Sequence, residues 1–351
     1  MSPEVNPDLI ELARESRGMT QSALAEATGS ISQPLISKIE HGTHTPSPER
    51  LEAIAAALKY PPEFFHQSGR IGWTVCLHHR KRQSMPVTRL KMIHAQVNIA
   101  RMQVMRLMRG IEIDSPLTFP RMDIAEYESP EQIARLARGH WRLPIGPVRS
   151  VIAAIEDAGG VVLRGDFDTT RLDAISIWVP GGPPFFFMNP GMPGDRWRWS
   201  LAHEMGHALM HTQPTADQEA EADRFASEFL MPADEIHSEL VRLTMPRLAE
   251  LKERWKVSMQ ALIRRAYQLE VITQRQQRSF FMRFSQMGYR KQEPFPIPQE
   301  EPQLLQSILE VHQTKHGYDA AELARSAFMS EEEFRTAYMP AAGKSRLRLV
   351  S

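Results

Sequence analysis

The residues best suited to chemistry in this 351-residue chain lie in the stretch RWSLAHEMGHALMH, residues 198–211. In a helix, His203 and His207 would be four residues apart on one face, where two imidazoles can bind a single zinc ion. Glu204 lies one step round the helix, poorly placed as a third ligand but well placed as a general base toward zinc-bound water. This short pattern also arises by chance, so a third ligand is needed downstream.

The following stretch, EAEADRFASEFLMP, supplies that carboxylate. Glu219 and Asp223 are four residues apart on the face that carries two small alanines, which would allow close packing on the histidine helix. We expect Glu219 to be the third ligand and Asp223 to orient a neighbouring imidazole. Glu221 lies in the same turn and is the competing ligand. His211 lies one turn beyond His207 and is expected to support or cap the site rather than to bind the metal.

Other elements must position this helix pair. Helices are expected at residues 129–144 and 146–160, with Ser129 as an N-cap, and a further helix from Asp195, as its cap, through His211. The runs VVLRGDF, AISIWVP and PFFFMN are separated by Gly, Pro and Asp, which predicts a small antiparallel sheet. PFFFMN is either an edge strand that pairs with an extended substrate or a buried strand.

These blocks together resemble the ImmA/IrrE family of zinc metallopeptidases over residues 128–240. Met210 and Gln213 stand where a metzincin would need Gly and His, so the site is of the gluzincin type. Ala174 stands where the family usually has Gly. The resemblance implies a zinc peptidase that cleaves a repressor protein, often an XRE-type regulator, by attack of activated water with Glu204 moving the proton.

The first 65 residues divide into short helical segments. Thr20, Ser32 and Ser47 are expected N-caps, and Gly29 and Gly42 follow helix ends. Two helices of about eight residues joined by a Gly-containing turn match the helix-turn-helix outline.

The stretch from Thr20 to Leu58 resembles the XRE family of DNA-binding domains, through TQ, LA, I-x-x-IE-x-G and a following proline. The resemblance implies that Gln33, Ser37 and Lys38 face the DNA groove and that Gln21 binds a backbone phosphate. It also implies a homodimer on a double-stranded operator.

Charge is distributed unevenly although the formal net charge is zero. Residues 1–63 hold five Lys or Arg and nine Asp or Glu, a net charge of −4, whereas residues 64–111 hold nine basic and no acidic residues. The basic stretch favours an anionic partner such as nucleic acid. It equally fits a basic surface docked on an acidic part of the same protein.

The sequence predicts a mainly α protein with a small sheet (α+β), made of an all-α helix-turn-helix domain, a gluzincin-like domain and a helical C-terminal region. The expected boundaries are 1–66 for the DNA-binding domain, 67–115 for a basic connector with a short strand and a long helix, 116–240 for the peptidase domain, 241–292 for a second helix-turn-helix-like segment, and 293–351 for a Pro-rich linker with C-terminal helices. Its single cysteine, Cys76, excludes a disulfide framework. Cys76, His78 and His79 lack a second ligand cluster, and we expect a strand there instead.

Neither a membrane span nor a basic, apolar leader is visible, so a cytoplasmic protein is expected. Three functions remain open: a DNA-binding regulator with an active zinc peptidase, a transcription factor or antitoxin of a toxin–antitoxin pair whose zinc domain is structural or sensory, and a peptidase whose helix-turn-helix domain only captures a protein substrate.

Overall fold

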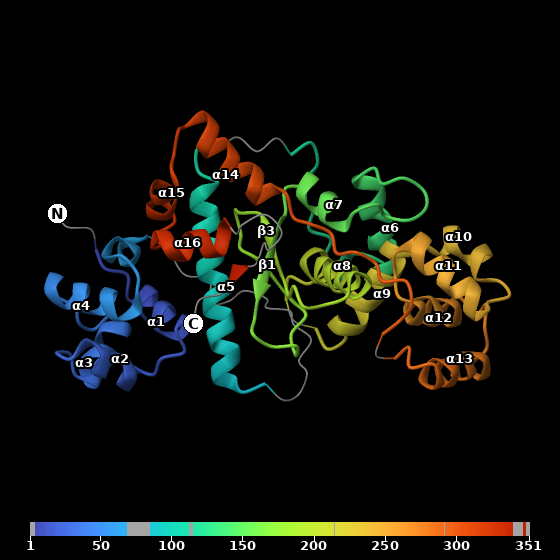
Figure 1. Ribbon diagram of the computed structural model, residues 1–351, viewed down its shortest axis with the longest axis horizontal. Helices are drawn as coiled ribbons and strands as arrows, with labels where there is room; N and C mark the ends of the chain where they lie inside the picture. Colours follow the sequence, from blue (N-terminus) through green and yellow to red (C-terminus); the bar gives the residue numbers. More distant parts are fainter. Residues whose placement is uncertain are drawn as a thin grey trace.

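The structure is a computed structural model that describes residues 4–68, 85–111, 115–213, 215–290, 292–339 and 347–348. Its elements follow one another in layers along the long axis of the molecule (Figure 1). The helix-turn-helix region lies at one end, followed by a long helix with the C-terminal helices, a small sheet, the helices of residues 124–230 and a final helical group. The helices of residues 124–230 carry the candidate ligands His203, His207 and Glu219 and are called the metal-site helices below. The mainly α fold with a small sheet is confirmed.

The N-terminal region contains α1 (Pro7–Ser16), α2 (Gln21–Thr28), α3 (Gln33–Glu40), α4 (Pro48–Leu58) and the 3-10 helix η1 (Pro62–His66). Thr20 caps α2 by accepting a hydrogen bond from the Ala23 amide at 3.1 Å. Gly29 ends α2 with a φ of 64°, a left-handed conformation that glycine adopts without steric cost. Ser32 and Ser47 occupy the N-cap positions of α3 and α4 without a side-chain cap bond.

The long helix α5 (Val87–Leu107) is buried on two sides. Ala95 and Ile99 belong to the core of the helix-turn-helix region. Ile93, Val97 and Val104 belong instead to a core shared with the sheet. One apolar side of α5 therefore covers the sheet, and a second covers the helix-turn-helix domain, with Gln96 donating to the Ser16 carbonyl at 3.0 Å.

The sheet contains β1 (Val161–Asp166), β2 (Ala174–Trp178), β3 (Pro184–Met188) and the two-residue β4 (Leu347–Arg348), in the order β2-β3-β1-β4. β3 is antiparallel to β2 but parallel to β1 and lies between them. The expectation of an antiparallel sheet is therefore wrong for the β1–β3 pair. The edge-strand interpretation of PFFFMN is also wrong: β3 is central and fully buried, and β2 is an edge strand of the described sheet.

The side chains of β3 point alternately to the two faces of the sheet, and each face belongs to a different hydrophobic core. Phe185 and Phe187 point to the α5 side, whereas Phe186 and Met188 point to the metal-site side. A run of apolar residues without polar alternation is what a strand covered on both faces requires.

The metal-site side is covered by η2 (Ile124–Glu126), α6 (Pro130–His140), α7 (Val151–Asp157), α8 (Gly194–Met210) and α9 (Gln218–Leu230). Ser129 caps α6 by accepting from the Gln132 amide at 3.2 Å. Asp195 is not the cap of α8, because Pro193 occupies that position. The Asp195 carboxylate lies within the first turn and accepts instead from Lys252 at 2.7 Å.

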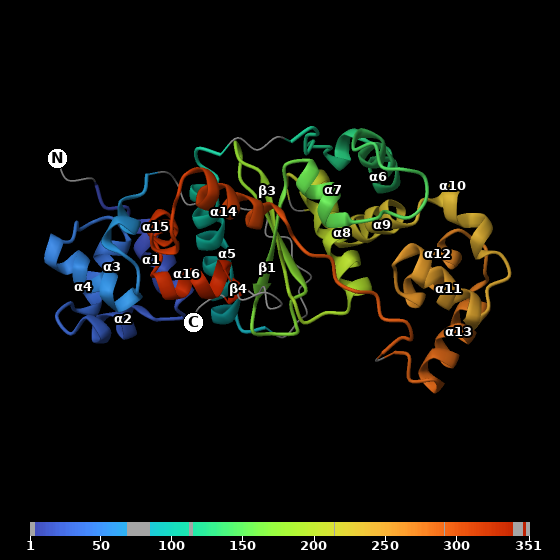
Figure 2. The ribbon, with the colours of Figure 1, turned by 45° about the horizontal axis from the view of Figure 1, so that its top comes forward.

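Beyond α9, the chain forms α10 (Ala233–Ile236), η3 (His237–Leu240), α11 (Met245–Trp255), α12 (Met259–Gln268) and α13 (Gln274–Gln286). Leu251, Trp255 and Leu262 join this group to the large core of the metal-site helices. The segment after α13 then crosses back along the molecule to α14 (Leu304–Lys315), α15 (Ala320–Ser326) and α16 (Glu331–Tyr338), which lie beside α5 (Figure 2).

The Pro-rich segment expected as a linker is in close contact with the metal-site layer. Glu300 accepts from Ser150 Oγ at 2.8 Å and from the Ile152 amide at 2.9 Å, and it pairs with the buried Arg198 of α8. Gly194 has no room for a Cβ atom beneath the backbone of Ile297 and Pro298. The segment thus fixes α7 and α8 as well as joining two groups of helices.

None of the described helices is long and apolar enough to cross a bilayer. The strand expected around Cys76, together with Cys76, His78 and His79, falls outside the described residues.

Candidate metal centre and helix-turn-helix surface

The candidate metal centre is built where α8 and α9 pack closely. A Cβ atom on Gly206 would come within 2.9 Å of the Phe225 ring, and Ala222 and Ala226 are fully buried at the same interface. Small residues on both helices let their backbones approach, which brings the side chains of α9 up to the histidine face of α8.

Three ligand-type side chains converge there. His203 Nε2 and His207 Nε2 are 3.1 Å apart. Glu219 of α9 places Oε2 3.6 Å from His203 Nε2 and Oε1 3.4 Å from His207 Nε2. Within the described residues, these three form the group whose ligand atoms lie close enough together to hold a metal ion.

The opposite ring nitrogens are held by other residues. His203 Nδ1 lies 2.9 Å from Asp223 Oδ1, and His207 Nδ1 lies 2.9 Å from His211 Nδ1. His211 Nε2 in turn lies 2.9 Å from Glu221 Oε2. Glu221 therefore contacts His211, whereas Glu219 faces the histidine pair.

These contacts determine where the protons lie. His203 donates from Nδ1 to Asp223, and His207 donates from Nδ1 to His211, which donates from Nε2 to Glu221. With Nδ1 engaged in this way, Nε2 is the atom of each ring that faces Glu219, and loss of any proton on Nε2 would give the tautomer that metal binding requires.

The carboxylates also shift the pKa values of the site. Hydrogen bonds from His203 and His207 hold the pKa of Glu219 far below its usual range. Burial disfavours charge on His203, but Asp223 and Glu219 outweigh it and raise its pKa to about 9. Burial lowers the pKa of His211, which favours the neutral ring inferred above.

The residues present fit a divalent metal ion. His203 Nε2 and His207 Nε2 lie 3.1 Å apart and both face the Glu219 carboxylate, at 3.6 and 3.4 Å, so one ion placed between the three side chains would be within reach of all of them. Two imidazoles and a carboxylate are the donor set of catalytic zinc sites that leave one coordination position for water.

Glu204 lies beside this group and is fully buried. Its Oε2 accepts a hydrogen bond from Ser176 Oγ of β2 at 2.6 Å. Burial raises the pKa of Glu204 to about 7, so the carboxyl group can both take and give a proton near neutral pH.

Space for reactants adjoins Glu204. A cavity of about 30 Å³, large enough for a water molecule, is lined by Arg171, His203 and Glu204. A larger cleft of about 710 Å³ shares Asp173, Trp199 and Ser200 with it and extends toward α12 and α13. The two cavities therefore adjoin each other, and the smaller one reaches His203 and Glu204.

In the helix-turn-helix domain, Gln33 and Lys38 are exposed on α3 and Ser37 is half-buried. Gln33 Nε2 donates to Gln21 Oε1 at 2.8 Å, and Gln21 Nε2 donates to Glu40 Oε2 at 2.8 Å. The buried Glu40 carboxylate is itself held by both arms of Arg14, at 2.6 and 2.9 Å. Gln21 thus connects Gln33 to a fixed ion pair in the domain core.

Sequence reasoning did not identify Ser176, Arg171 or the residues of the cleft. Ser176 lies on a strand 28 residues before Glu204, and its polar side chain amid the apolar run AISIW was the one available signal.

Comparisons with known families match two parts of the chain. Residues 10–65 match the helix-turn-helix family model, and residues 155–267 match the model of the IrrE N-terminal-like domain, a peptidase family. The second match includes the histidine pair and the α9 carboxylates and continues through most of α12. No curated protein matches the chain.

Proposed function

We propose that this chain, in which an XRE-type helix-turn-helix domain is fused to an IrrE/ImmA-like metallopeptidase-type domain, is a DNA-binding regulator that also hydrolyses a protein substrate. The observation that carries the proposal is the convergence of His203, His207 and Glu219 beside the buried Glu204. A metal site with a purely structural role would not need Glu204, a buried carboxyl group beside the metal ligands whose pKa lies near neutral.

In this proposal, His203, His207 and Glu219 hold zinc, which when bound supplies the Lewis acidity that activates water and polarises the peptide carbonyl. Glu204 accepts the proton from the attacking water and delivers it to the departing amine. Ser176 fixes the Glu204 carboxylate through its hydrogen bond. Asp223 and His211, backed by Glu221, hold the two imidazoles in the required tautomer.

The substrate would be an extended segment of a protein. β2 is an edge strand of the described sheet and carries Ser176, so a peptide that added to β2 would pass alongside Glu204. The adjoining 710 Å³ cleft has room for several side chains. We propose an XRE-type repressor as the substrate, whose cleavage would release the genes it silences.

The peptidase proposal is tested with Glu204→Gln and Glu219→Gln in the purified, zinc-loaded protein. Glu204→Gln should retain one zinc per chain and lose at least about 100-fold in cleavage of repressors encoded beside it, because the general base is removed. Glu219→Gln should lose both zinc and cleavage. Metal content and cleavage rate are the two measurements.

Glu221→Gln separates the two candidate ligands, since it should weaken zinc binding by about tenfold through His211 and not abolish it. Glu253→Gln, on the exposed side of α11, is the matched control. Normal cleavage by Glu204→Gln would contradict the peptidase proposal. The remaining function would then be that of a transcription factor or antitoxin whose metal site is structural or sensory.

DNA binding is tested with the double variant Gln33→Ala, Lys38→Ala in gel shifts over a salt series. Loss of one adenine or guanine contact should cost about 1–3 kcal/mol, and loss of Lys38 should flatten the salt dependence. Glu26→Ala, on the exposed surface of α2, is the control. Unchanged affinity would favour a helix-turn-helix domain that captures a protein instead. Whether a homodimer binds the operator follows from the stoichiometry of the shifted complex.

A further inference from the structure

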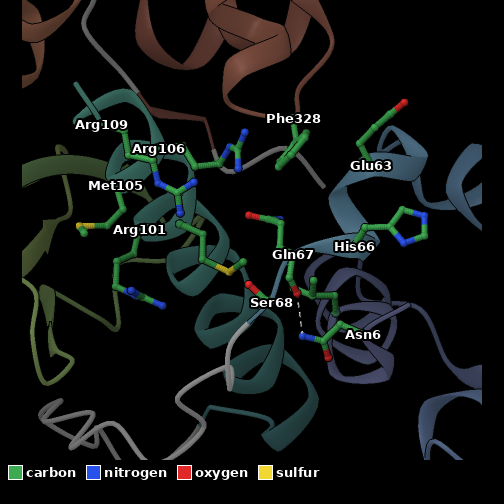
Figure 3. Close-up of a pocket in the computed structure, with 12 residues that line it drawn as sticks. Asn6, Glu63, His66, Gln67, Ser68, Arg101, Met105, Arg106, Arg109 and Phe328 are labelled. Carbon is green, nitrogen blue, oxygen red and sulfur yellow. Dashed lines mark hydrogen bonds between the residues drawn. The ribbon is translucent and has the colours of Figure 1, made fainter. Parts of the chain in front are cut away.

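A second cavity, of about 410 Å³, lies where three parts of the molecule meet (Figure 3). One wall comes from the start of α1 and from η1 with the residues after it, the second from the C-terminal half of α5, and the third from Phe328 in the turn after α15. Its lining includes no residue of the described α2, α3 or metal-site helices. Its volume is in the range of small-molecule sites.

The α5 wall is strongly basic. Arg101 and Arg106 of α5 line the cavity, together with Arg109 just beyond the end of this helix. Among the described residues of the lining, Glu63 is the one carboxylate; it is exposed at the rim and points away from the arginines (Figure 3). The cavity therefore has an excess of positive charge that the described part of its lining does not neutralise.

Arg101 is the least satisfied of these groups. Its Nε atom is buried and has no hydrogen-bond partner among the described residues. Burial lowers the pKa of Arg101, as expected for a guanidinium that has lost water without gaining a carboxylate. An anion in the cavity would supply the missing acceptor, and guanidinium groups bind carboxylate and phosphate in a bidentate manner.

Arg106 is held in position. Its Nε donates to the Ser326 carbonyl at 2.6 Å, and its guanidinium lies over the Phe328 ring at 3.7 Å. Burial, followed by the nearby charge of Arg109, lowers the pKa of Arg106. Arg106 therefore joins α5 to the C-terminal helices and leaves Arg101 and Arg109 as the freer cations of the cavity.

The remaining lining is apolar or neutral. Leu9, Met102, Met105 and Phe328 contribute hydrophobic surface, and methionine adapts readily to ligands of different shape. Asn6 and Gln67 lie on the wall opposite α5 and are joined by a hydrogen bond of 3.1 Å. A ligand that satisfied both kinds of wall would have an anionic head and an apolar body.

We propose that this cavity binds a small organic anion, a carboxylate or phosphate carried on an apolar group, between α5 and the helix-turn-helix domain. The proposal goes beyond the function proposed above and requires neither peptidase activity nor an operator. Because the ligand would contact the helix-turn-helix domain, α5 and the turn before α16 at once, its binding would stabilise their junction.

The test uses the full-length, zinc-loaded protein with four probes: hexanoate, phenyl phosphate, inorganic phosphate and 1-hexanol. Hexanoate or phenyl phosphate should bind with one site per chain by calorimetry and raise Tm. The comparison of these two identifies the preferred head group. Inorganic phosphate, which lacks the apolar body, and 1-hexanol, which lacks the anionic head, should each bind at least about tenfold more weakly.

The double variant Arg101→Met, Arg109→Met should abolish the ligand-induced rise in Tm. Its Tm without ligand should equal or exceed that of the wild type, because a buried cation without an acceptor is removed and Arg106 is kept. Arg275→Met, Arg278→Met, two exposed arginines of α13, is the matched control and should respond to ligand normally.

The proposal is overturned if no probe binds, if inorganic phosphate or hexanol binds as tightly as the organic anions, or if the cavity variant still responds to ligand. Weaker DNA binding by the cavity variant, without binding of any probe to the wild type, would also overturn it and identify the arginines as DNA phosphate contacts. Zinc content and cleavage are measured separately on the same samples, so failure of the peptidase proposal would not affect this test.

Discussion

At the scale of single residues, the candidate site depends on which hydrogen-bond partner each polar side-chain atom has. Both Nδ1 atoms of His203 and His207 are engaged by neighbours, which leaves both Nε2 atoms directed at one point beside Glu219. The Glu204 carboxylate is also held by a neighbour, because one of its buried oxygens accepts a hydrogen bond from Ser176. The side chains one layer out therefore determine what the inner ones can do.

Ser176→Ala should lower kcat/KM for cleavage by about tenfold with zinc content unchanged. The variant removes a hydrogen bond to the general base, and hydrogen bonds to charged groups contribute about 1.5–3 kcal/mol. Ser176→Thr retains a hydroxyl group and should recover part of the activity. Full activity in Ser176→Ala would show that Glu204 is positioned without this contact.

At the scale of elements, the site depends on how closely α8 and α9 approach. Gly206 is the point of closest contact, facing the fully buried Phe225. The two helices supply different functional groups, so a small change in their separation alters the distance between Glu219 and both imidazoles. Glycine here provides space rather than backbone freedom.

Gly206→Ala should destabilise the protein by up to about 2 kcal/mol. Overpacking of a core lowers the free energy of unfolding by about 1–3 kcal/mol, whereas the higher helix propensity of alanine raises it by about 1 kcal/mol. Gly139→Ala is the matched control, since it lies in α6 with nothing within 4 Å of an added Cβ atom, and it should be neutral or stabilising. Thermal unfolding and zinc affinity measure the effect. Equal behaviour of the two variants would contradict the proposed tight contact.

At the scale of the whole molecule, the C-terminal segment links regions that are distant in sequence. Glu300 pairs with Arg198 and caps the start of α7, while Arg17 of the helix-turn-helix domain pairs with Glu333 of α16 at 3.2 Å. Glu156, in α7, accepts from the Gln303 and Leu304 amides at the start of α14. The chain from Glu300 to Glu333 thus contacts α7, α8 and the helix-turn-helix domain.

Glu156 gives this connection a pH dependence. Burial raises the pKa of Glu156 to about 7 in the folded protein, above its ordinary value of 4.5. The folded state therefore binds the proton more tightly, and stability falls as pH rises from about 4.5 through 7. Glu156→Gln should be more stable than the wild type at pH 8, by about 1–2 kcal/mol after solvent screening, and close to it at pH 4.5.

Thermal unfolding at several pH values measures this difference, with Asp157→Asn, the exposed neighbour, as control. A constant difference between Glu156→Gln and the wild type across the pH range would show that Glu156 is not titrating in this interval.

Much of the local structure follows from the sequence because its causes are local. Thr20, Ser129 and Gly29 define helix ends through contacts within a turn, and the spacing of His203 and His207 places both on one helix face. The two family resemblances, drawn from motifs of this kind, are confirmed by the matches at residues 10–65 and 155–267.

The rest was decided by tertiary structure, because its causes lie far apart in the chain. Periodicity cannot distinguish a central strand from an edge strand when both are apolar, so β3 was placed only by its pairing with β1 and β2. The spacing of Glu219 and Glu221 allowed either to face the histidines; the packing of α9 on α8 turned Glu219 toward them and Glu221 toward His211. The arginine-lined cavity exists only because the helix-turn-helix domain and the C-terminal helices both dock on α5.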